Sequence, residues 1–385
     1  MAIGIYVQVP FCQTRCTYCN FHTGVVSRDQ YLPYVDAICR EIGENEGAIT
    51  VEADTIYIGG GTPSLLEPSA LAKILQKLRG VYAGEPSEVT LEADPETVTP
   101  EKAAQWRNAG INRISLGAQS FQDNELKAAG RMHRRDDIYR AADLLRAAGI
   151  RNISMDLIAG LPHQTRQSWE DSVSQLLRIY PEHISIYMLE IDEGSRLGRE
   201  ALSGGERYSA GALPSDDDTA DFYDSARERL KSAGYEHYEV SNWGLPGKQS
   251  QHNLKYWRRD AYIGFGAGAH SFDGAIRWAN VHESPRYVRL IDAGTSVREQ
   301  IEPVTPPVAL SEDMFLGLRQ LRGADFARIE KEYSVEPVLR DRLAMLRLRI
   351  ETLQSHGMLE FDGTFVRIPP EKLTISSEIL LELLS

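Results

Sequence analysis

The chain has 385 residues, of which 42% are hydrophobic and 25% are charged, which is typical of a soluble protein with a large α/β domain and an appendage. Its formal net charge of −13 argues against a surface that neutralises nucleic-acid phosphates. The first residues lack the basic segment of a signal peptide, and no apolar run approaches the roughly 20 residues of a membrane span, so we expect a cytoplasmic protein.

Strand-like and helix-like segments alternate through the first half of the chain. Strands are expected over Ile3–Val9, Asp54–Ile58, Glu88–Ala93, Ile111–Leu116, Asn152–Ile158 and Ile184–Leu189. Helices are expected in the connections, first behind the N-cap Ser27 and then over about Pro68–Gly80, Pro100–Gly110, Arg135–Ala148 and Gln167–Tyr180. This alternation predicts a parallel sheet with right-handed crossovers, in the form of an open, partial (β/α)6 barrel with its chemistry at the carboxyl ends of the strands.

Three of the four cysteines follow the first strand as C-x3-C-x2-C, at Cys12, Cys16 and Cys19. A structural zinc site takes four protein ligands, and so does an ordinary four-iron ferredoxin cluster. Three thiolates on a four-iron cluster leave one iron open for a small ligand. The spacing favours an iron–sulfur cluster, while thiols without metal, or zinc completed by His22, stay open. Cys39 lies in a helical pattern and is expected to be a buried core thiol, and this cysteine usage indicates a reducing compartment.

Polar or glycine residues stand at the ends of the later strands. Gly59, Gly60 and Gly61 end the second strand, where glycine lets backbone approach a ligand closely or simply forms a turn. Glu92 ends the third strand and could bind ribose hydroxyls or cap a helix. Asp156 lies inside an apolar strand, where a carboxylate is costly unless it has a partner. Two further polar residues belong to this group, Gln119 after the fourth strand and Arg131 in the next connection.

The cysteine spacing, followed by aromatic residues, resembles the cluster loop of the radical S-adenosylmethionine (SAM) enzymes. In that superfamily the open iron chelates the amino and carboxylate groups of SAM. A larger set resembles the oxygen-independent coproporphyrinogen III oxidase superfamily over residues 1 to about 190: Y-x-x-x-P-F-C-x-x-x-C-x-Y-C-x-F, G-G-G-T-P-S, L-E-A-D-P, R-I-S-L-G-A-Q-S-F and D-L-I-x-G-L-P.

The resemblance implies a [4Fe-4S] cluster on the three loop cysteines and SAM on its open iron. The SAM-contacting positions of the superfamily fall on Tyr6, Gly60, Gly61, Thr62, Glu92, Gln119, Arg131 and Asp156. In the oxidase some of these positions contact a second SAM. Gln119, Arg131 and Asp156 therefore stay open between serving one SAM, serving a second one and being inherited without use.

Two departures point away from the oxidase. The oxidase pattern is C-x3-C-x2-C-x-C, and in this sequence Phe21 stands where that pattern has its last cysteine. The oxidase also has an N-terminal arm that covers its active site, and Cys12 lies so near the start of this sequence that we expect no such arm.

A second motif follows residue 190. His252, Asn253, Tyr256 and Trp257 form H-N-x-x-Y-W, and G-x-G-A-G-A-H-S ends with His270 and Ser271. Together these segments resemble the haem chaperone HemW branch of the superfamily. The resemblance implies haem binding, with His252 as the imidazole ligand and the two aromatic rings as apolar walls. The alternative makes the rings core aromatics and His252 a packing residue, and His270 is the competing ligand.

The last part of the chain has a different pattern. Glu302–Pro307 is expected to be a linker because of its prolines. Helical patterns over Leu310–Arg322, Phe326–Tyr333 and about Pro337–His356, followed by a hairpin with an Asp-Gly turn, predict a winged-helix-like α+β domain. Such domains often bind DNA, but residues 305–385 carry 10 Lys and Arg against 13 Asp and Glu, which favours packing or docking. We expect boundaries at residues 1–190, 191–300 and 301–385.

Three functions compete. The leading one is a haem chaperone that binds a [4Fe-4S] cluster, SAM and haem and passes haem to an acceptor protein, for which the resemblance suggests respiratory enzymes. The second is oxidative decarboxylation of coproporphyrinogen in porphyrin biosynthesis, through a radical that the cluster generates from SAM. The third is a nucleic-acid-binding regulator, which the acidic charge disfavours. No catalytic residue is assigned, no transmembrane segment is expected, and peripheral membrane contact stays open.

Overall fold

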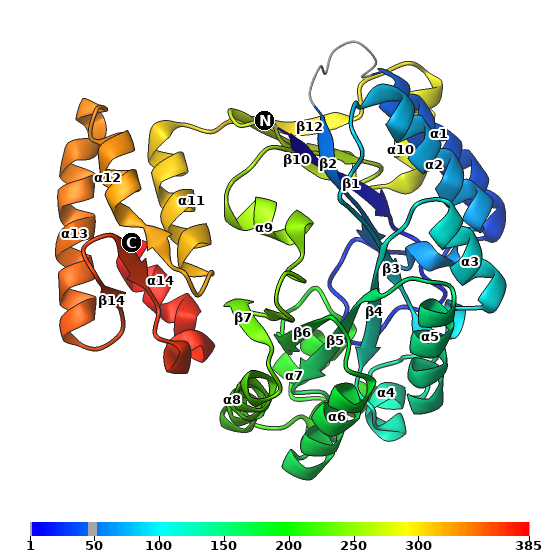
Figure 1. Ribbon diagram of the computed structural model, residues 1–385, viewed down its shortest axis with the longest axis horizontal. Coiled ribbons are helices and arrows are strands. Elements are labelled where there is room, and N and C mark those ends of the chain that lie inside the picture. The colour runs from blue at the N-terminus through cyan, green and yellow to red at the C-terminus, as the bar shows by residue number, and fades with distance from the viewer. Residues whose placement is uncertain (1, 45–51, 385) are drawn as a thin grey trace.

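The computed structural model describes residues 2–44 and 52–384. Six parallel strands form the centre of its main sheet and lie side by side in chain order. They are β1 (Ile3–Val9), β2 (Ala53–Gly60), β3 (Glu88–Ala93), β4 (Arg113–Gln119), β5 (Asn152–Ala159) and β6 (His183–Met188). The predicted partial barrel of six β/α units is therefore confirmed, as Figure 1 shows.

Helices cover the outer face of the barrel (Figure 1). They are α1 (Tyr31–Glu44), α2 (Pro68–Val81), α3 (Pro100–Asn108), α4 (Asp123–Ala128), α5 (Arg135–Ala147) and α6 (Arg166–Ile179). In α1 the side chains of Val35, Ile38 and Ile42 are spaced three or four residues apart and are fully buried against the sheet. Ser27 precedes only a short 3-10 turn and makes no side-chain cap, so the expected N-cap is wrong and α1 begins at Tyr31.

The central strands are buried on both faces, as parallel strands covered by helices should be. Ile5, Val7, Ile58 and Leu91 each lie in the hydrophobic core with no exposed surface. Polar residues still alternate with apolar ones in several of these strands, as in E-V-T-L-E-A of β3 and R-I-S-L-G-A-Q of β4. Burial of both faces leaves the strand ends as the part of the sheet that can present polar groups to a ligand.

Residues after position 190 extend this sheet at both edges instead of forming a separate layer. At one edge β9 (Tyr262–Phe265) pairs in parallel with β1, and β10 (His270–Phe272), β11 (Ile276–Asn280) and β12 (Arg298–Pro303) follow antiparallel. At the other edge β8 (Asn242–Gly244) pairs antiparallel with β6, and β7 (Glu236–Glu239) pairs with β8. The described residues of this sheet form twelve strands. The helices of this region are α7 (Arg196–Leu202), α8 (Asp216–Ser232), α9 (Gln251–Trp257) and α10 (Ser284–Asp292).

The chain ends in a small α+β domain, as predicted. Its elements are α11 (Pro306–Leu318), β13 (Ala324–Asp325), α12 (Phe326–Tyr333), α13 (Arg340–Ser355), β14 (Glu360–Phe361), β15 (Phe365–Arg367) and α14 (Ser376–Leu384). The three short strands form one antiparallel sheet, which gives the element order of a winged-helix domain. The expected linker at Glu302–Pro307 is shorter than predicted, because β12 runs to Pro303 and α11 begins at Pro306.

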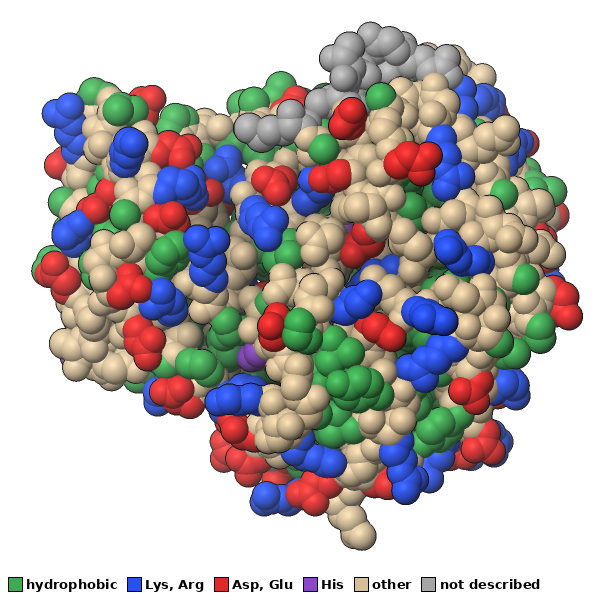
Figure 2. All heavy atoms as spheres, viewed as in Figure 1, with side chains coloured by type: hydrophobic (Ala, Val, Ile, Leu, Met, Phe, Trp, Pro, Cys, Tyr) green, Lys and Arg blue, Asp and Glu red, His purple; other side chains and the backbone are tan. Residues whose placement is uncertain are grey.

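Ion pairs hold this domain against the rest of the molecule. Arg259 follows α9 and pairs with both Glu312 and Asp313 on α11. On the face shown in Figure 2, basic and acidic side chains are interspersed over the barrel and the C-terminal domain. Among the described residues, none of the helices has the length and apolar character needed to cross a bilayer.

Candidate functional site

A cavity of ≈ 480 Å3 lies at the carboxyl ends of the parallel strands, beside the loop that follows β1. The fold brings ten of the residues singled out from the sequence together in its lining: Cys12, Cys16, Cys19, Gly60, Gly61, Thr62, Glu92, Gln119, Arg131 and Asp156. Tyr6 is not in the lining. Its hydroxyl donates to Gln8 Oε1 over 2.7 Å, and its ring stacks on Tyr57 in the interior.

The three loop cysteines are unpaired and half-buried. Burial raises the pKa of the Cys12 thiol to about 11. Cys19 Sγ lies 3.8 Å from the Thr23 hydroxyl, and Cys16 Sγ accepts a hydrogen bond of 3.4 Å from Arg131 Nη1. A bound metal would deprotonate such thiols and supply the charge that makes thiolates stable there. The fourth cysteine, Cys39, is half-buried on α1 rather than part of the closed core, and it lies outside the cavity.

The positions of the possible metal-binding side chains bear on whether a single ion or a larger cluster could bind here. Within residues 2–44 and 52–384 no three His, Cys, Asp or Glu side chains converge where one ion could bind. The ring of His22 lies against that of His282, 4.3 Å apart between centroids, and this contact does not favour the zinc alternative. A four-iron cluster is larger than an ion and takes its thiolates on different irons. Three thiols spread along one wall of a cavity fit that requirement.

The glycines of the second strand end form a close-fitting part of the wall. Gly60 has a φ of +119°, which L side chains rarely adopt, and a Cβ there would lie 2.6 Å from Gln8 Nε2. A Cβ on Gly61 would lie 2.5 Å from the Phe11 carbonyl oxygen and 2.9 Å from Cys12 Sγ. A side chain at Gly60 would meet Gln8, and one at Gly61 would meet the cysteine loop, so neither position can take a Cβ unless its neighbours move.

Carboxylates on β3 and β5, the two strands that flank β4, line the cavity. Glu92 accepts hydrogen bonds from the Tyr57 hydroxyl (2.8 Å) and the Gly60 N–H (2.9 Å), and burial raises its pKa to about 7. Burial likewise raises the pKa of Asp156 to about 6. Gln119 has a φ of 64° in a bulged strand end, and its buried Oε1 has no partner among the described residues. An acceptor left without a donor in a cavity wall indicates that a ligand hydrogen bonds there.

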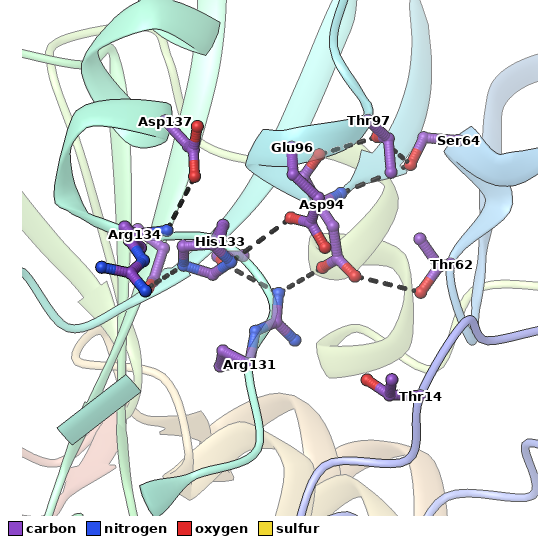
Figure 3. A network of polar contacts seen from close by, with 12 residues as sticks. Thr14, Thr62, Ser64, Asp94, Glu96, Thr97, Arg131, His133, Arg134 and Asp137 are labelled. Atoms are coloured by element: carbon purple, nitrogen blue, oxygen red, sulfur yellow. Dashed lines mark hydrogen bonds and ion pairs between the residues drawn. The ribbon is translucent and has the colours of Figure 1, made fainter. Parts of the chain in front are cut away.

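Arg131 connects this lining to the cysteine loop. One guanidinium nitrogen, Nη2, pairs with Asp94 and also donates to the Gly117 carbonyl oxygen (3.0 Å), while Nη1 donates to Cys16 Sγ (3.4 Å). Asp94 in turn accepts a hydrogen bond of 3.2 Å from the Thr62 hydroxyl, and Figure 3 shows the contacts of Asp94 with Arg131 and Thr62. Sequence reasoning missed Asp94, although it stands two residues after Glu92 in L-E-A-D-P and shares its strand end.

The H-N-x-x-Y-W motif lies away from this cavity. His252 is on α9, which packs on β2, and its Nδ1 lies 2.9 Å from the hydroxyl of Thr55 near the start of that strand. Glu88, the first residue of β3, accepts a hydrogen bond from the backbone N–H of His252 (3.0 Å). The motif therefore lies at the amino ends of the strands, whereas the cavity lies at their carboxyl ends. The structure does not bring the two groups together.

The motif is closely packed in this arrangement. His252 is 1% exposed, and its second ring nitrogen, Nε2, lies 2.9 Å from the Tyr256 hydroxyl. Both imidazole nitrogens are thus engaged, and burial lowers the pKa of His252 to about 3. Asn253 donates its backbone N–H to the N-cap Ser250, while the indole nitrogen of Trp257 is buried without a partner in the described residues. His270, the competing candidate, is exposed on β10.

Comparisons with known proteins show which family and which fold the chain shares. Residues 6–176 match the model of the radical SAM superfamily, and residues 304–371 match the HemN C-terminal domain. The chain is 37% identical to the haem chaperone HemW of Synechocystis over 86% of this chain and 81% of that protein. It is 35% identical to HemW of Bacillus subtilis, over 85% and 86% of the two chains. The solved structure of coproporphyrinogen III oxidase (HemN) from Escherichia coli has the same fold, with a TM-score of 0.84 at 20% identity over 99% of this chain and 90% of that one.

Proposed function

The chain belongs to the HemW family within the radical SAM superfamily, and from this premise we propose that it is a haem chaperone. In this role it holds a [4Fe-4S] cluster and SAM in the strand-end cavity, binds haem, and passes the haem to an acceptor protein. The observation that carries the cofactor part is the gathering of the three cysteines and seven further predicted residues in the lining of one cavity.

Each part of the cavity has a role in this proposal. Cys12, Cys16 and Cys19 would hold the cluster at one end of the cavity, beside the space that SAM would occupy. The backbone at Gly60 and Gly61 receives the amino end of SAM, because both glycines line the cavity and carry no side chain that could cover the backbone. Glu92 accepts hydrogen bonds from the ribose hydroxyls. When bound, the reduced cluster can supply one electron to the sulfonium of SAM.

Phe21 supports a carrier over an oxidase. It stands where the oxidase pattern has a further cysteine, lines the cavity, and is 67% exposed. An exposed aromatic ring at the rim is a suitable contact for the flat apolar face of a porphyrin. A carrier needs such an accessible rim because it must release its cargo to another protein, whereas an oxidase must shield its substrate from water beside a radical.

The second candidate is the coproporphyrinogen III oxidase reaction. Gln119, Arg131 and Asp156 all line the cavity, and by resemblance these are positions that contact a second SAM in the oxidase. If they hold a second SAM here, the chain retains more of the oxidase machinery than a carrier requires. This candidate predicts product formation from coproporphyrinogen III.

Parallel assays on one anaerobic preparation test the two functions. Protein with a reconstituted cluster is titrated with haemin and followed by its Soret absorption, and a second sample is incubated with coproporphyrinogen III, SAM and a reductant. We expect saturable haem binding, transfer of haem to an apo-haem protein, and no protoporphyrinogen. Steady protoporphyrinogen production would establish the oxidase instead. Cys16→Ser is the control for product formation that does not depend on the cluster.

A further inference from the structure

Gly59 opens the G-G-G-T-P-S segment, but its surroundings differ from those of the two glycines that follow it. Gly60 and Gly61 line the strand-end cavity, whereas Gly59 does not. A Cβ on Gly59 would lie 2.9 Å from Tyr57 Cε1 and 3.0 Å from Glu92 Cδ. The missing side chain of Gly59 therefore leaves room for an aromatic ring and a carboxyl group to meet beside the backbone of β2.

Tyr57 and Glu92 form a hydrogen-bonded pair at the cavity wall. The Tyr57 hydroxyl lies 2.8 Å from Glu92 Oε1. Burial, followed by the nearby Glu92 carboxylate, raises the pKa of Tyr57 well above its ordinary value, so the phenol keeps its proton and is the donor. The other carboxylate oxygen accepts from the Gly60 N–H (2.9 Å). One donor on each oxygen restrains the orientation of the carboxyl group, which lines the cavity.

Two further rings hold the Tyr57 ring in place. Tyr57 stacks on Tyr6, with centroids 6.0 Å apart and 21° between the planes, and on His252, with centroids 5.3 Å apart and 30° between the planes. His252 is itself fixed, because its ring nitrogens lie 2.9 Å from the hydroxyls of Thr55 and Tyr256. Since α9 carries His252 at the amino ends of the strands, the position of Tyr57 depends on packing at that end of the barrel.

Other titratable groups act on Glu92 through space. Burial is the largest cause of its raised pKa, and the carboxylates of Asp156 and Asp94 raise it further. Three phenols have raised pKa values, mainly through burial and partly through the charge of Glu92: Tyr6, Tyr187 and Tyr256. The hydrogen bond from Tyr57 acts in the opposite direction on Glu92, because it favours the ionised carboxylate and lowers the pKa. Among the described side chains, Tyr57 alone donates a hydrogen bond to this carboxylate.

We propose that Tyr57 is a positioning residue of the SAM site. Its hydroxyl holds the Glu92 carboxylate in the orientation that accepts from the ribose, Gly59 leaves the room for this pair, and His252 supports the Tyr57 ring from the amino ends of the strands. This inference rests on the proposed binding of SAM in the cavity, and it names a residue outside the cavity lining on which that binding depends.

The test is calorimetric titration of cluster-loaded full-length Tyr57→Phe with SAM across neutral pH. We expect SAM binding near pH 7 to weaken roughly 3- to 10-fold, the size of one hydrogen bond. The midpoint of the pH dependence should move to higher pH, because the lost hydrogen bond favoured the ionised carboxylate. A mere packing defect would leave that midpoint unchanged. The matched control is Tyr139→Phe, whose lost hydroxyl donates to Gln175 (2.5 Å) outside the cavity.

Two further variants test whether Tyr57 acts through Glu92. Gly59→Ala adds one methyl group between the ring and the carboxyl group and changes no residue of the cavity lining. It should weaken SAM binding and move the pH midpoint in the same direction as Tyr57→Phe. In a Glu92→Gln background, Tyr57→Phe should change SAM affinity by no more than about twofold, because a residue that acts through another has non-additive effects.

The outcomes separate this inference from the proposed function. If the wild-type protein binds no SAM, the proposed role of the cavity fails and the positioning role fails with it. If the wild type and Tyr57→Phe bind SAM with the same affinity and the same pH midpoint, Tyr57 is not a positioning residue while the SAM site stands. Additive effects of the Tyr57 and Glu92 changes would equally overturn the inference. Cluster absorption and urea unfolding verify that each variant is folded.

Discussion

Arg131 donates a hydrogen bond from Nη1 to Cys16 Sγ over 3.4 Å, while its other terminal nitrogen pairs with Asp94. The arginine side chain is only 9% exposed. A buried cation that donates to a ligand sulfur stabilises negative charge on that sulfur. Arg131 therefore connects the cavity lining to Cys16, and it would influence the electronic properties of a cluster bound there.

We expect Arg131→Gln to lower the reduction potential of the reconstituted cluster by tens of millivolts. The reduced cluster carries one more negative charge than the oxidised one. Removal of the Arg131 cation therefore costs the reduced cluster more electrostatic stabilisation. Potentiometric titration followed by electron paramagnetic resonance measures this change. Arg135→Gln is the control, because Arg135 pairs with Asp171 at the surface, outside the cavity. An equal shift of the reduction potential in both variants would contradict a specific effect of Arg131 on the cluster.

Cysteine replacement tests the cluster ligands. Cys16→Ser should abolish the charge-transfer absorption of the anaerobically reconstituted protein, because it removes one of the three loop thiolates. Cys39→Ser should leave iron content and absorption unchanged, since Cys39 lies on α1 outside the cavity. Loss of absorption in the Cys39 variant alone would contradict the ligand assignment.

Gly60→Val should greatly weaken SAM binding while the cluster is retained. The new side chain would meet Gln8 and force a β-branched residue to a φ of +119°, which costs about 1–3 kcal/mol of unfolding free energy. Calorimetric titration with SAM measures the affinity, and iron analysis checks the cluster. Gly80→Val on α2 is the control, because a Cβ there meets nothing within 4 Å. Unchanged SAM affinity in Gly60→Val would remove this glycine from the site.

SAM affinity should depend on pH through Glu92. Burial raises the pKa of Glu92 to about 7, so the carboxylate is largely ionised above this pH and protonated below it. The ionised form is the better acceptor for ribose hydroxyls, and SAM should therefore bind more weakly as the pH falls through about 7. Calorimetry between pH 6 and pH 8.5 tests this range. The Glu92→Gln variant should bind SAM weakly at every pH. If it keeps the pH dependence of the wild type, the titrating group is not Glu92.

Glu92 should affect the stability of the SAM-free protein in the opposite direction. SAM affinity falls as the pH falls, whereas the free energy of unfolding should rise. The folded pKa of Glu92 is raised above the ordinary value of 4.5, so its protonated form stabilises the fold. That contribution is fully present below pH 4.5 and is lost as the pH rises through about 7. Comparing the pH dependence of urea unfolding in the wild type and in Glu92→Gln isolates this contribution. If the difference in unfolding free energy between the wild type and Glu92→Gln stays constant from pH 4.5 to pH 7, the raised pKa of Glu92 is contradicted.

The barrel could be predicted because its strands are local patterns. Segments such as Glu88–Ala93 are buried on both faces, and helices with apolar stripes separate them. The hydrophobic periodicity of each segment and the alternation of strands and helices were therefore sufficient to predict the barrel. Among the strands towards the sheet edges, β8 and β9 could not be predicted in this way. β8 and β9 have three and four residues, and their places beside β6 and β1 depend on long-range pairing that leaves no periodic signal.

The gathering of the candidate site residues in one cavity was predictable for a different reason. In a parallel sheet the carboxyl ends of all strands meet at one edge, so Gly60, Glu92 and Asp156 had to lie near one another once the strands were recognised. Asp94 was missed because its role depends on Arg131, which comes from another connection. His252 looked like an available ligand in the sequence, but its contacts with Thr55 and Tyr256 arise only when α9 packs on β2.

The pairing of β1 with both β2 and β9 has a consequence for biosynthesis. Gly4 lies beside Thr55 on one side and beside Tyr262 on the other. On the ribosome the strand that leads into the cysteine loop can acquire its first neighbour early, but its second side stays an open edge until residue 265 has emerged. Iron delivered to a nascent chain before that point would meet an incomplete scaffold. Cluster insertion is therefore expected to follow translation of the β9 segment, and chains truncated before it should fail to retain iron.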